Sequence, residues 1–256
     1  MKRALIFMVI GLVCVSMAAV CRAGGSGPVE PLGTAKFALS GEYNGVFDMD
    51  LKKNGDITGG EVEESHQGYA KLAVGVSDNV NLYARLGAAN LEEKLKWNNS
   101  TSHTIKYDNG LLWGIGGNGV YDFGNNFGIG GNLQLDAWFT DADSISGDNS
   151  PTFVNKGSLN NYEFQTSLYL KYTYNLGVKL TPYAGGYYSY FNSKIDKTIR
   201  YQDSNATTYT PGDMKNDDNF GLLAGVDIAA TDKIVLNVEG RFIAETAVTG
   251  AVSYKF

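Results

Sequence analysis

Cysteine is almost absent from this sequence. Its 256 residues contain two, Cys14 and Cys21, and both lie near the N-terminus. Residues 1–23 have the pattern of a cleaved signal peptide: two basic residues at positions 2 and 3, an apolar run, and a small-x-small site at its end. The uncharged run is short for a membrane anchor, and Val20 is a poor residue before a lipidated cysteine. Cleavage would leave a mature chain without disulfides, thiolate nucleophiles or cysteine-bound metals.

The sequence also lacks an excess of basic residues. It contains 21 Lys and Arg against 27 Asp and Glu, and removal of Lys2, Arg3 and Arg22 with the signal leaves 18 against 27, a net charge of −9. This balance excludes a nucleic-acid-binding protein. After residue 23 no apolar run is long enough for a transmembrane helix, so any membrane crossing must be made by strands.

Alternation with a period of two dominates the last 35 residues, 222–256. A sustained period of two predicts strands with one apolar and one polar face. Short turns at Thr231-Asp232 and Glu245-Thr246 separate three such segments. The apolar series are Leu222, Ala224, Val226 and Ile228; Ile234, Leu236, Val238, Gly240 and Phe242; and Val248, Gly250, Val252, Tyr254 and Phe256.

The polar positions between these apolar residues include charges on all three segments. If those charges meet in a polar interior, the apolar face points outward, as in a transmembrane β-barrel, where the surroundings are lipid. A soluble β-sandwich would show the same alternation with the opposite orientation, and detection of the protein in detergent-extracted outer membrane would exclude it. The charged positions are Asp227, Glu239, Arg241 and Lys255.

The rest of the chain predicts seven further strands, ten in all, joined by alternately long and short connections. An even number of strands with this alternation is typical of an up-and-down barrel, with long loops outside the cell and both termini on the side of the short turns. Residues 24–33, which contain Pro28 and Pro31, predict a flexible periplasmic lead-in to a barrel domain at 34–256. The seven strands are predicted at 34–47, 68–77, 80–90, 107–121, 127–140, 161–174 and 180–193, the last without a definite phase, and the four long loops at 48–67, 91–106, 141–160 and 193–218.

The C-terminal segments are similar to those of the small outer-membrane β-barrel superfamily that includes the OmpA, OmpX and opacity-type barrels. The resemblance rests on residues 225–227, 231–233 and 238–242 and on the closing residues 250–256. It covers the mature chain as architecture, and its motifs cover only these last 35 residues. Members commonly have eight strands, so eight remains the alternative to ten. The resemblance implies that Val252, Tyr254 and Phe256 form the terminal signal recognised by the outer-membrane assembly machinery.

Inward-facing charges are the main candidates for function within the barrel. A ten-stranded barrel is only slightly wider than one whose side chains fill the interior. Paired charges would then form a plug, and unpaired ones would line a narrow pore for ions or small solutes. The predicted lumen charges are Lys71, Arg85, Lys171, Arg241 and Lys255 with Asp136, Glu163, Asp227 and Glu239.

Two further motifs are weak. Residues 50–61 have the spacing of a calcium-binding EF-hand loop, with Asp50, Asn54, Asp56 and Glu61 as candidate ligands. Lys52 occupies a ligand position, however, and an EF-hand needs flanking helices, so a chance match in an acidic loop is favoured. The two histidines, His66 and His103, fall in predicted loops without the paired pattern that catalysis requires.

The sequence therefore predicts a non-enzymatic β-barrel without cofactors in the bacterial outer membrane, with a structural or surface-interaction role through its external loops. The alternative is a narrow porin-like channel. Expected partners are outer-membrane lipid, lipopolysaccharide, the assembly machinery and an extracellular ligand of unknown identity. The divalent cations that bridge lipopolysaccharide fit the acidic loops, but no spacing defines a site for them.

Overall fold

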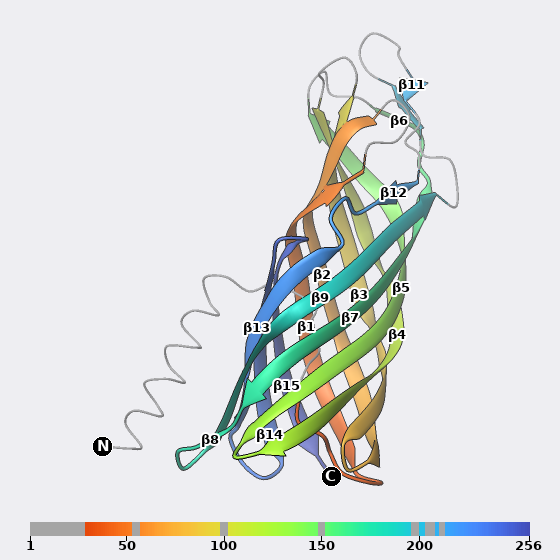
Figure 1. Ribbon diagram of the computed structural model, residues 1–256. Helices are drawn as coiled ribbons and strands as arrows, with labels where there is room; N and C mark the ends of the chain where they lie inside the picture. The colour runs from red at the N-terminus through yellow and green to blue at the C-terminus, as the bar shows by residue number, and fades with distance from the viewer. Residues whose placement is uncertain are drawn as a thin grey trace.

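The chain forms a closed barrel of ten antiparallel strands (Figure 1). The computed structural model describes residues 29–52, 57–97, 102–147, 152–195, 200–202, 208–209 and 213–256. The predicted signal peptide at residues 1–23 lies outside them. The barrel strands are β1 (Phe37–Leu51), β2 (Ile57–Ser77), β3 (Val80–Trp97), β4 (Ser102–Gly124), β5 (Phe127–Gly147), β7 (Ser158–Tyr172), β9 (Lys179–Ile195), β13 (Phe220–Ala229), β14 (Ile234–Phe242) and β15 (Thr246–Lys255).

Closure is made between the first and last strands. Each strand pairs with its neighbour in sequence, and β15 pairs with β1 from Ala38↔Lys255 to Asp48↔Thr246. The backbone N–H of Phe256 donates to the carbonyl oxygen of Phe37 at 2.9 Å, which continues this pairing to the last residue. The prediction of ten strands is confirmed, and the alternative of eight is wrong. No helix among the described residues is long and apolar enough to cross a membrane.

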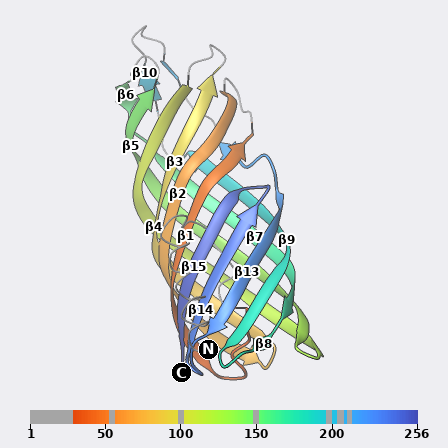
Figure 2. The ribbon, with the colours of Figure 1, turned by 90° about the vertical axis from the view of Figure 1, so that its left-hand side faces the viewer.

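Tight turns connect the strands at the end where the C-terminus lies (Figures 1 and 2). Between β4 and β5 the turn residues Asn125 and Asn126 have φ values of 51° and 66°. Two successive residues in this left-handed region characterise a type I′ hairpin turn, and Asn is one of the few residues that adopt it at low cost. In a transmembrane barrel this end faces the periplasm.

The predicted long loops are the main error of the sequence analysis. Most of residues 48–67, 91–106 and 141–160 belongs to paired strands, because β2 to β5 continue far beyond the membrane-spanning part. The cross-strand register runs as far as Ile57↔Trp97 and His103↔Gly147, so the backbone polar groups of these segments are satisfied in the sheet. Polar outer faces give these strand ends the composition of loops.

Strand β3 shows how the two halves of the barrel differ. In its lower half Leu82 and Leu86 are exposed, whereas Arg85 is buried. In its upper half Leu91 and Leu95 are buried, and the charged residues other than Glu93, which is buried, face outward. Polarity therefore inverts along one strand without any change of phase. The apolar core that results in the upper half comprises Val46, Met49, Leu51, Ile57, Val62, Tyr69, Ala89, Leu91, Leu95, Ile105, Tyr107, Leu112, Trp138, Ala142, Leu159, Phe191 and Met214.

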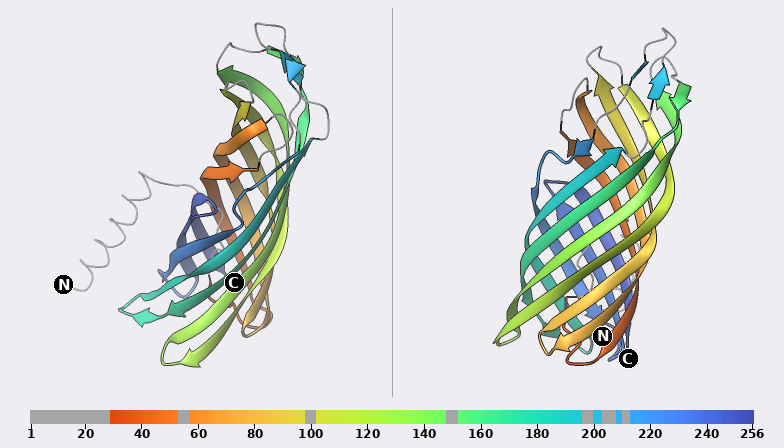
Figure 3. Two further views of the ribbon diagram at one scale, coloured as in Figure 1. Left: turned by 45° about the horizontal axis from the view of Figure 1, so that its top comes forward. Right: turned by 90° about the vertical axis from the view of Figure 1, so that its right-hand side faces the viewer.

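The wall is lower on one side, where β13, β14 and β15 span nine or ten residues each. Above them a short strand, β12 (Met214–Lys215), pairs with β9, and Asn216 bridges to Leu51 of β1. This segment closes the upper barrel with fewer strands than the lower one. Higher still, β6 (Thr152–Asn155), β10 (Arg200–Gln202) and β11 (Thr208–Tyr209) form a separate small sheet (Figure 3).

Candidate functional site in the barrel lumen

All nine charged residues predicted to face the lumen lie on the inner face of the wall. Eight are buried, and Lys255 is partly buried at the periplasmic end. Their position follows from the alternation: the apolar residues between them are exposed to lipid, and a period of two places the intervening side chains inside. Whether these charges line a pore depends on how they are paired.

The centre of the lumen contains a pair between Arg85 of β3 and Asp136 of β5, whose side chains are 1% and 2% exposed. Arg85 also donates to the hydroxyl of Tyr69 at 2.8 Å, and the amide of Gln134 donates to Asp136 at 2.9 Å. A second ion pair joins Lys71 of β2 to Glu42 of β1. Both basic groups are thus neutralised by carboxylates from other strands.

A third group lies at the upper boundary of the polar zone. The Nε of Arg241 is 3.3 Å from Oε1 of Glu245, four residues later and beyond the end of β14. The hydroxyl of Ser189 donates to Glu163 at 3.3 Å. The guanidinium of Arg241 also lies over the ring of Tyr187, with 5.5 Å to the ring centroid.

Hydrogen bonds also hold two further carboxylates of the inner wall, Glu239 and Asp227. Tyr183 donates to Glu239 at 2.9 Å. The amide of Asn237 donates to Asp227 at 2.7 Å and to the Tyr183 hydroxyl at 3.0 Å. Four side chains from β9, β13 and β14 thus form one continuous network across this side of the lumen.

Inward tyrosines fill the space that the charges leave, and they are not among the predicted site residues. Tyr183 lies over Gly225 and Tyr169 over Gly130, where an added Cβ atom would come within 2.4 Å of the tyrosine ring in each case. The glycines leave room for rings to lie flat against the wall. Tyrosines on both faces of β9 explain why alternation alone gives this strand no phase, and inward glycine opposite tyrosine is the signal that would have identified its inner face.

The lead-in enters the barrel, in contrast to the flexible segment that the sequence predicts at 24–33. Residues 24–28 lie outside the described residues. Val29 is fully buried, and its N–H donates to Asp227 at 2.8 Å, while the N–H of Leu32 donates to Asn81 at 3.0 Å. The carboxylate of Glu30 binds two lysines inside the periplasmic mouth. The strands at the periplasmic mouth thus gain hydrogen-bond partners from this segment for Asp227, for Asn81 and for the two lysines.

Glu30 accepts hydrogen bonds from Lys179 at 2.7 Å and from Lys171 at 3.0 Å. Lys171 also lies 2.9 Å from Asp122 of β4. Burial by itself raises the pKa of Glu30, but the hydrogen bonds from Lys179 and Lys171 outweigh this effect and hold the pKa below its usual value. The carboxylate is therefore charged at neutral pH. We refer to residues 29–34, which include Glu30, as the strap.

Two cavities inside the barrel have volumes of about 10 and 30 Å³. A cavity needs about 10–15 Å³ to hold one water molecule, so the smaller of these two holds at most one water and the larger about two. A larger hollow of about 400 Å³ lies on the outer wall. It is lined by exposed side chains of the lipid-facing band, among them Trp113, Leu135 and Tyr162, and by the buried residues Asp136, Ala137 and Glu163.

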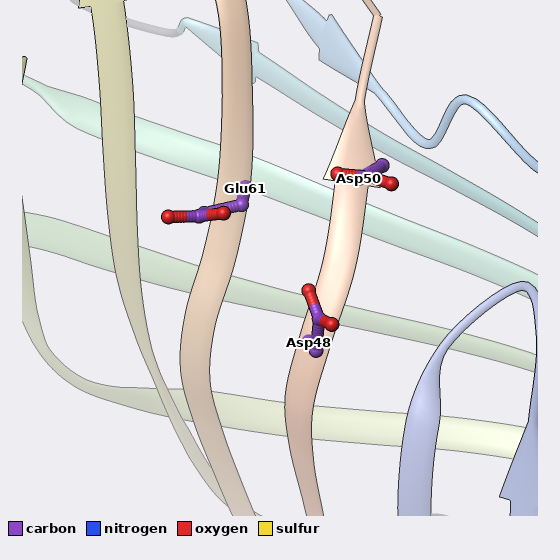
Figure 4. A group of neighbouring side chains, drawn as sticks. All are labelled: Asp48, Asp50 and Glu61. Atoms are coloured by element: carbon purple, nitrogen blue, oxygen red, sulfur yellow. The ribbon is translucent and has the colours of Figure 1, made fainter.

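The calcium motif is only partly described. Asn54 and Asp56 lie outside the described residues, and the described flanks are strands rather than helices. Asp50 of β1 pairs with Glu61 of β2, and oxygens of these two carboxylates and of Asp48 lie within 4.8 Å of one another (Figure 4). Lys94 lies 3.2 Å from Glu61 and competes with any cation there.

The two histidines lie far from each other in the barrel. His66 is on the outer face of β2, where its Nδ1 is 2.6 Å from the Tyr43 hydroxyl and its Nε2 is 3.3 Å from Glu64. His103 is buried at the extracellular end of β4. The contacts of His66 involve a phenol and one carboxylate, and we assign no catalytic role to this group.

The three residues of the predicted assembly signal lie on the outer face of β15 and just beyond it. Val252, Tyr254 and Phe256 are all exposed, and the rings of Tyr254 and Phe256 meet edge to face with centroids 5.1 Å apart. Their role in assembly stays a prediction.

Comparison with known proteins places the chain among outer-membrane barrels. The family model described as "Outer membrane protein beta-barrel domain" matches residues 94–256. No curated protein sequence matches the chain significantly. Solved structures similar to the chain include the translocator domain of the autotransporter NalP from Neisseria meningitidis, with 13% identity, a TM-score of 0.47 and coverage of 88% of each chain.

OprG from Pseudomonas aeruginosa has 11% identity and a TM-score of 0.38, with coverage of 90% of this chain and 99% of that chain. The outer membrane protease OmpT from Escherichia coli has 9% identity and a TM-score of 0.42, with coverage of 87% and 96%. At such scores these similarities carry no argument about function. The family match spans more than half of the chain and agrees with the inverted polarity of its wall: this protein belongs to the outer membrane protein beta-barrel domain family, and it resides in the bacterial outer membrane.

Proposed function

We propose that the protein is a non-conducting, non-catalytic barrel whose work lies at the cell surface, in the extracellular part formed by β2 to β5 and the small sheet above them. The single observation that carries this proposal is the filling of the barrel: strap, paired charges, tyrosines and apolar core follow one another from the periplasmic to the extracellular end.

Energetics favour the filled state. A buried charge that loses its partner costs several kcal/mol, so the pairs Arg85–Asp136 and Lys71–Glu42 resist separation. Above them, burial of each large apolar side chain stabilises the core by about 1.5–3 kcal/mol. An ion crossing the barrel would have to disrupt both layers.

The extracellular part suits surface interaction because it is built as a rigid scaffold. Its strands are paired to near their ends and packed around an apolar core, whereas its outer face carries charges such as Glu63, Lys94 and Lys106. Binding surfaces are typically carried by polar segments held on a rigid framework.

Single-channel recording in planar bilayers tests the proposal. The protein, refolded without residues 1–23 and shown to be folded, is expected to give no discrete conductance steps. Reproducible steps whose ion selectivity changes in R85Q or D136N would instead establish the narrow channel. K96Q, on the outer face of β3, is the matched control and is expected to leave the recording unchanged.

A further inference from the structure

The strap occupies a recognition site at the periplasmic mouth that is built from several strands. Its partners come from β3, β7, β9 and β13, namely Asn81, Lys171, Lys179 and Asp227. These residues are far apart in sequence, so the site exists only in the closed barrel. Both the backbone N–H groups and the Glu30 side chain of the strap make hydrogen bonds there, which is more than a chance surface contact would provide.

One part of the site is an apolar pocket. Val29 is fully buried in a cluster with Tyr169, Tyr183, Tyr187, Leu223 and Ala244. The tyrosines are held in place by the wall itself, through the glycines behind them and the hydrogen bonds of Tyr183. The pocket therefore has a fixed shape that accepts a branched apolar side chain.

A second part recognises a carboxylate. Lys171 and Lys179 donate to the two different oxygens of Glu30, and Glu30 is the residue directly after Val29. Hydrogen bonds between charged groups are about twice as strong as neutral ones. The site thus recognises an acidic residue that directly follows the apolar residue in the pocket.

The third part recognises extended backbone. Asp227 accepts the N–H of Val29, and Asn81 accepts the N–H of Leu32. The side chain of Leu32 borders the cavity of about 30 Å³. Beyond the strap, Gly33 and Ala35 have φ values of 88° and 59°, and this reversal returns the chain to the start of β1.

We propose that the periplasmic mouth is a binding site for an extended peptide of the pattern apolar, acidic, any residue, apolar, and that the strap is its internal ligand. The partner is a periplasmic polypeptide carrying such a segment, which binds when the strap is released. The site opens toward the periplasm, and it holds a piece of chain that is not part of the wall, so the same groups can bind the same chemistry from another chain. This inference does not depend on whether the barrel conducts.

The test uses the chain without residues 1–23, with the substitutions V29S and E30Q, which weaken the strap and lie outside every strand. The probe is a fluorescein-labelled peptide with the sequence of residues 27–34, and binding is measured by fluorescence anisotropy. The double variant is expected to bind the peptide saturably. The wild-type chain should bind at least about tenfold more weakly, because its tethered strap competes at high effective concentration.

Two comparisons make the result specific. A peptide with glutamine in place of the glutamate should bind at least about tenfold more weakly, since hydrogen bonds to a charged group are stronger than those to a neutral one. K179Q in the same background should also weaken binding, whereas K233Q, in the turn between β13 and β14, should not. E30Q alone serves as the second variant if the double variant does not refold.

Three outcomes would overturn the proposal. They are the absence of saturable binding by a folded variant, equal binding of the glutamate and glutamine peptides, and equal binding by the wild-type chain. Folding is verified independently by β-type circular dichroism and by the heat-dependent shift in gel mobility.

Discussion

At the scale of single residues, the lumen is organised by pairs that would be costly to separate. Arg85 and Asp136 form one such pair, with both side chains almost fully buried and with Tyr69 and Gln134 adding one hydrogen bond to each. Because both side chains are almost inaccessible to water, each charge is compensated mainly by the other. The outer ion pair of Lys106 and Glu92 has the same chemistry in a more exposed setting.

D136N is expected to lower the free energy of unfolding by about 3–5 kcal/mol, because it leaves the Arg85 guanidinium buried without a counter-charge. Urea titration of the refolded protein measures the change. E92Q, which disrupts the exposed pair, is the control and should alter stability little. The double substitution R85M/D136L should recover much of the loss. An equal effect of D136N and E92Q on the free energy of unfolding would show that the Arg85–Asp136 pair contributes no more to stability than an exposed ion pair does.

Glu30 makes the attachment of the strap dependent on pH. Its pKa is lower in the folded protein than in the unfolded chain because Lys179 and Lys171 bind the charged form. Its contribution to stability is therefore complete above the usual glutamate pKa of 4.5 and is lost as the pH falls through the lower folded value.

The difference in unfolding free energy between the wild-type chain and E30Q isolates this effect from other titrating groups. The difference should be largest at neutral pH and shrink in acid. A difference that stays constant or grows as the pH falls would contradict the assignment. E92Q again serves as the control, since it lies outside the mouth.

At the scale of elements, β3 and β5 keep the same inward phase along their length while the composition of their inward positions changes. In β3 and β5 the residues at alternate positions continue to face inward while they change from polar to apolar, as with Asp136 followed by Trp138. In β1 the register with β15 shifts between Val46 and Asp48, and a bulge of this kind changes the direction of following side chains. The extracellular half thus has a mainly apolar interior and a polar outer face, whereas the membrane half has a polar interior and an apolar outer face.

L95A is expected to make the extracellular part sensitive to added protease on intact cells. Leu95 is fully buried in the apolar core, and removal of a buried leucine side chain costs about 2–5 kcal/mol. The membrane-spanning strands should remain protected. K96A, at the neighbouring outward position, should stay as resistant as the wild-type protein. Equal protease sensitivity of the two variants would argue against a packed extracellular core.

At the scale of the whole molecule, we expect insertion into the outer membrane and stability of the folded barrel to be separable. Phe256 is 67% exposed on the outer face at the point where β15 meets β1, so its ring contributes little to packing. The proposed role of the terminal residues in assembly therefore predicts a defect in delivery without a defect in the folded state.

F256A should reduce the amount of barrel assembled in the outer membrane severalfold, while refolding of the purified chain into detergent remains unchanged. Heat-dependent gel mobility measures both quantities. F220A removes a similarly exposed aromatic side chain from β13 and is the control. A comparable loss of assembly in both variants would assign the effect to lipid contact rather than to the terminal signal.

The sequence by itself determined the strand count, the phase of most membrane strands and the inward position of the charges, because alternation in a strand is a local property. The same locality explains its errors: polar outer faces beyond the membrane have the composition of loops, and tyrosines on both faces of β9 hide its phase. Only closure of the barrel decided which charges meet, that the upper interior is apolar, and that Glu30 lies between Lys171 and Lys179. These contacts join residues up to 149 positions apart, and no local pattern specifies a distance of that kind.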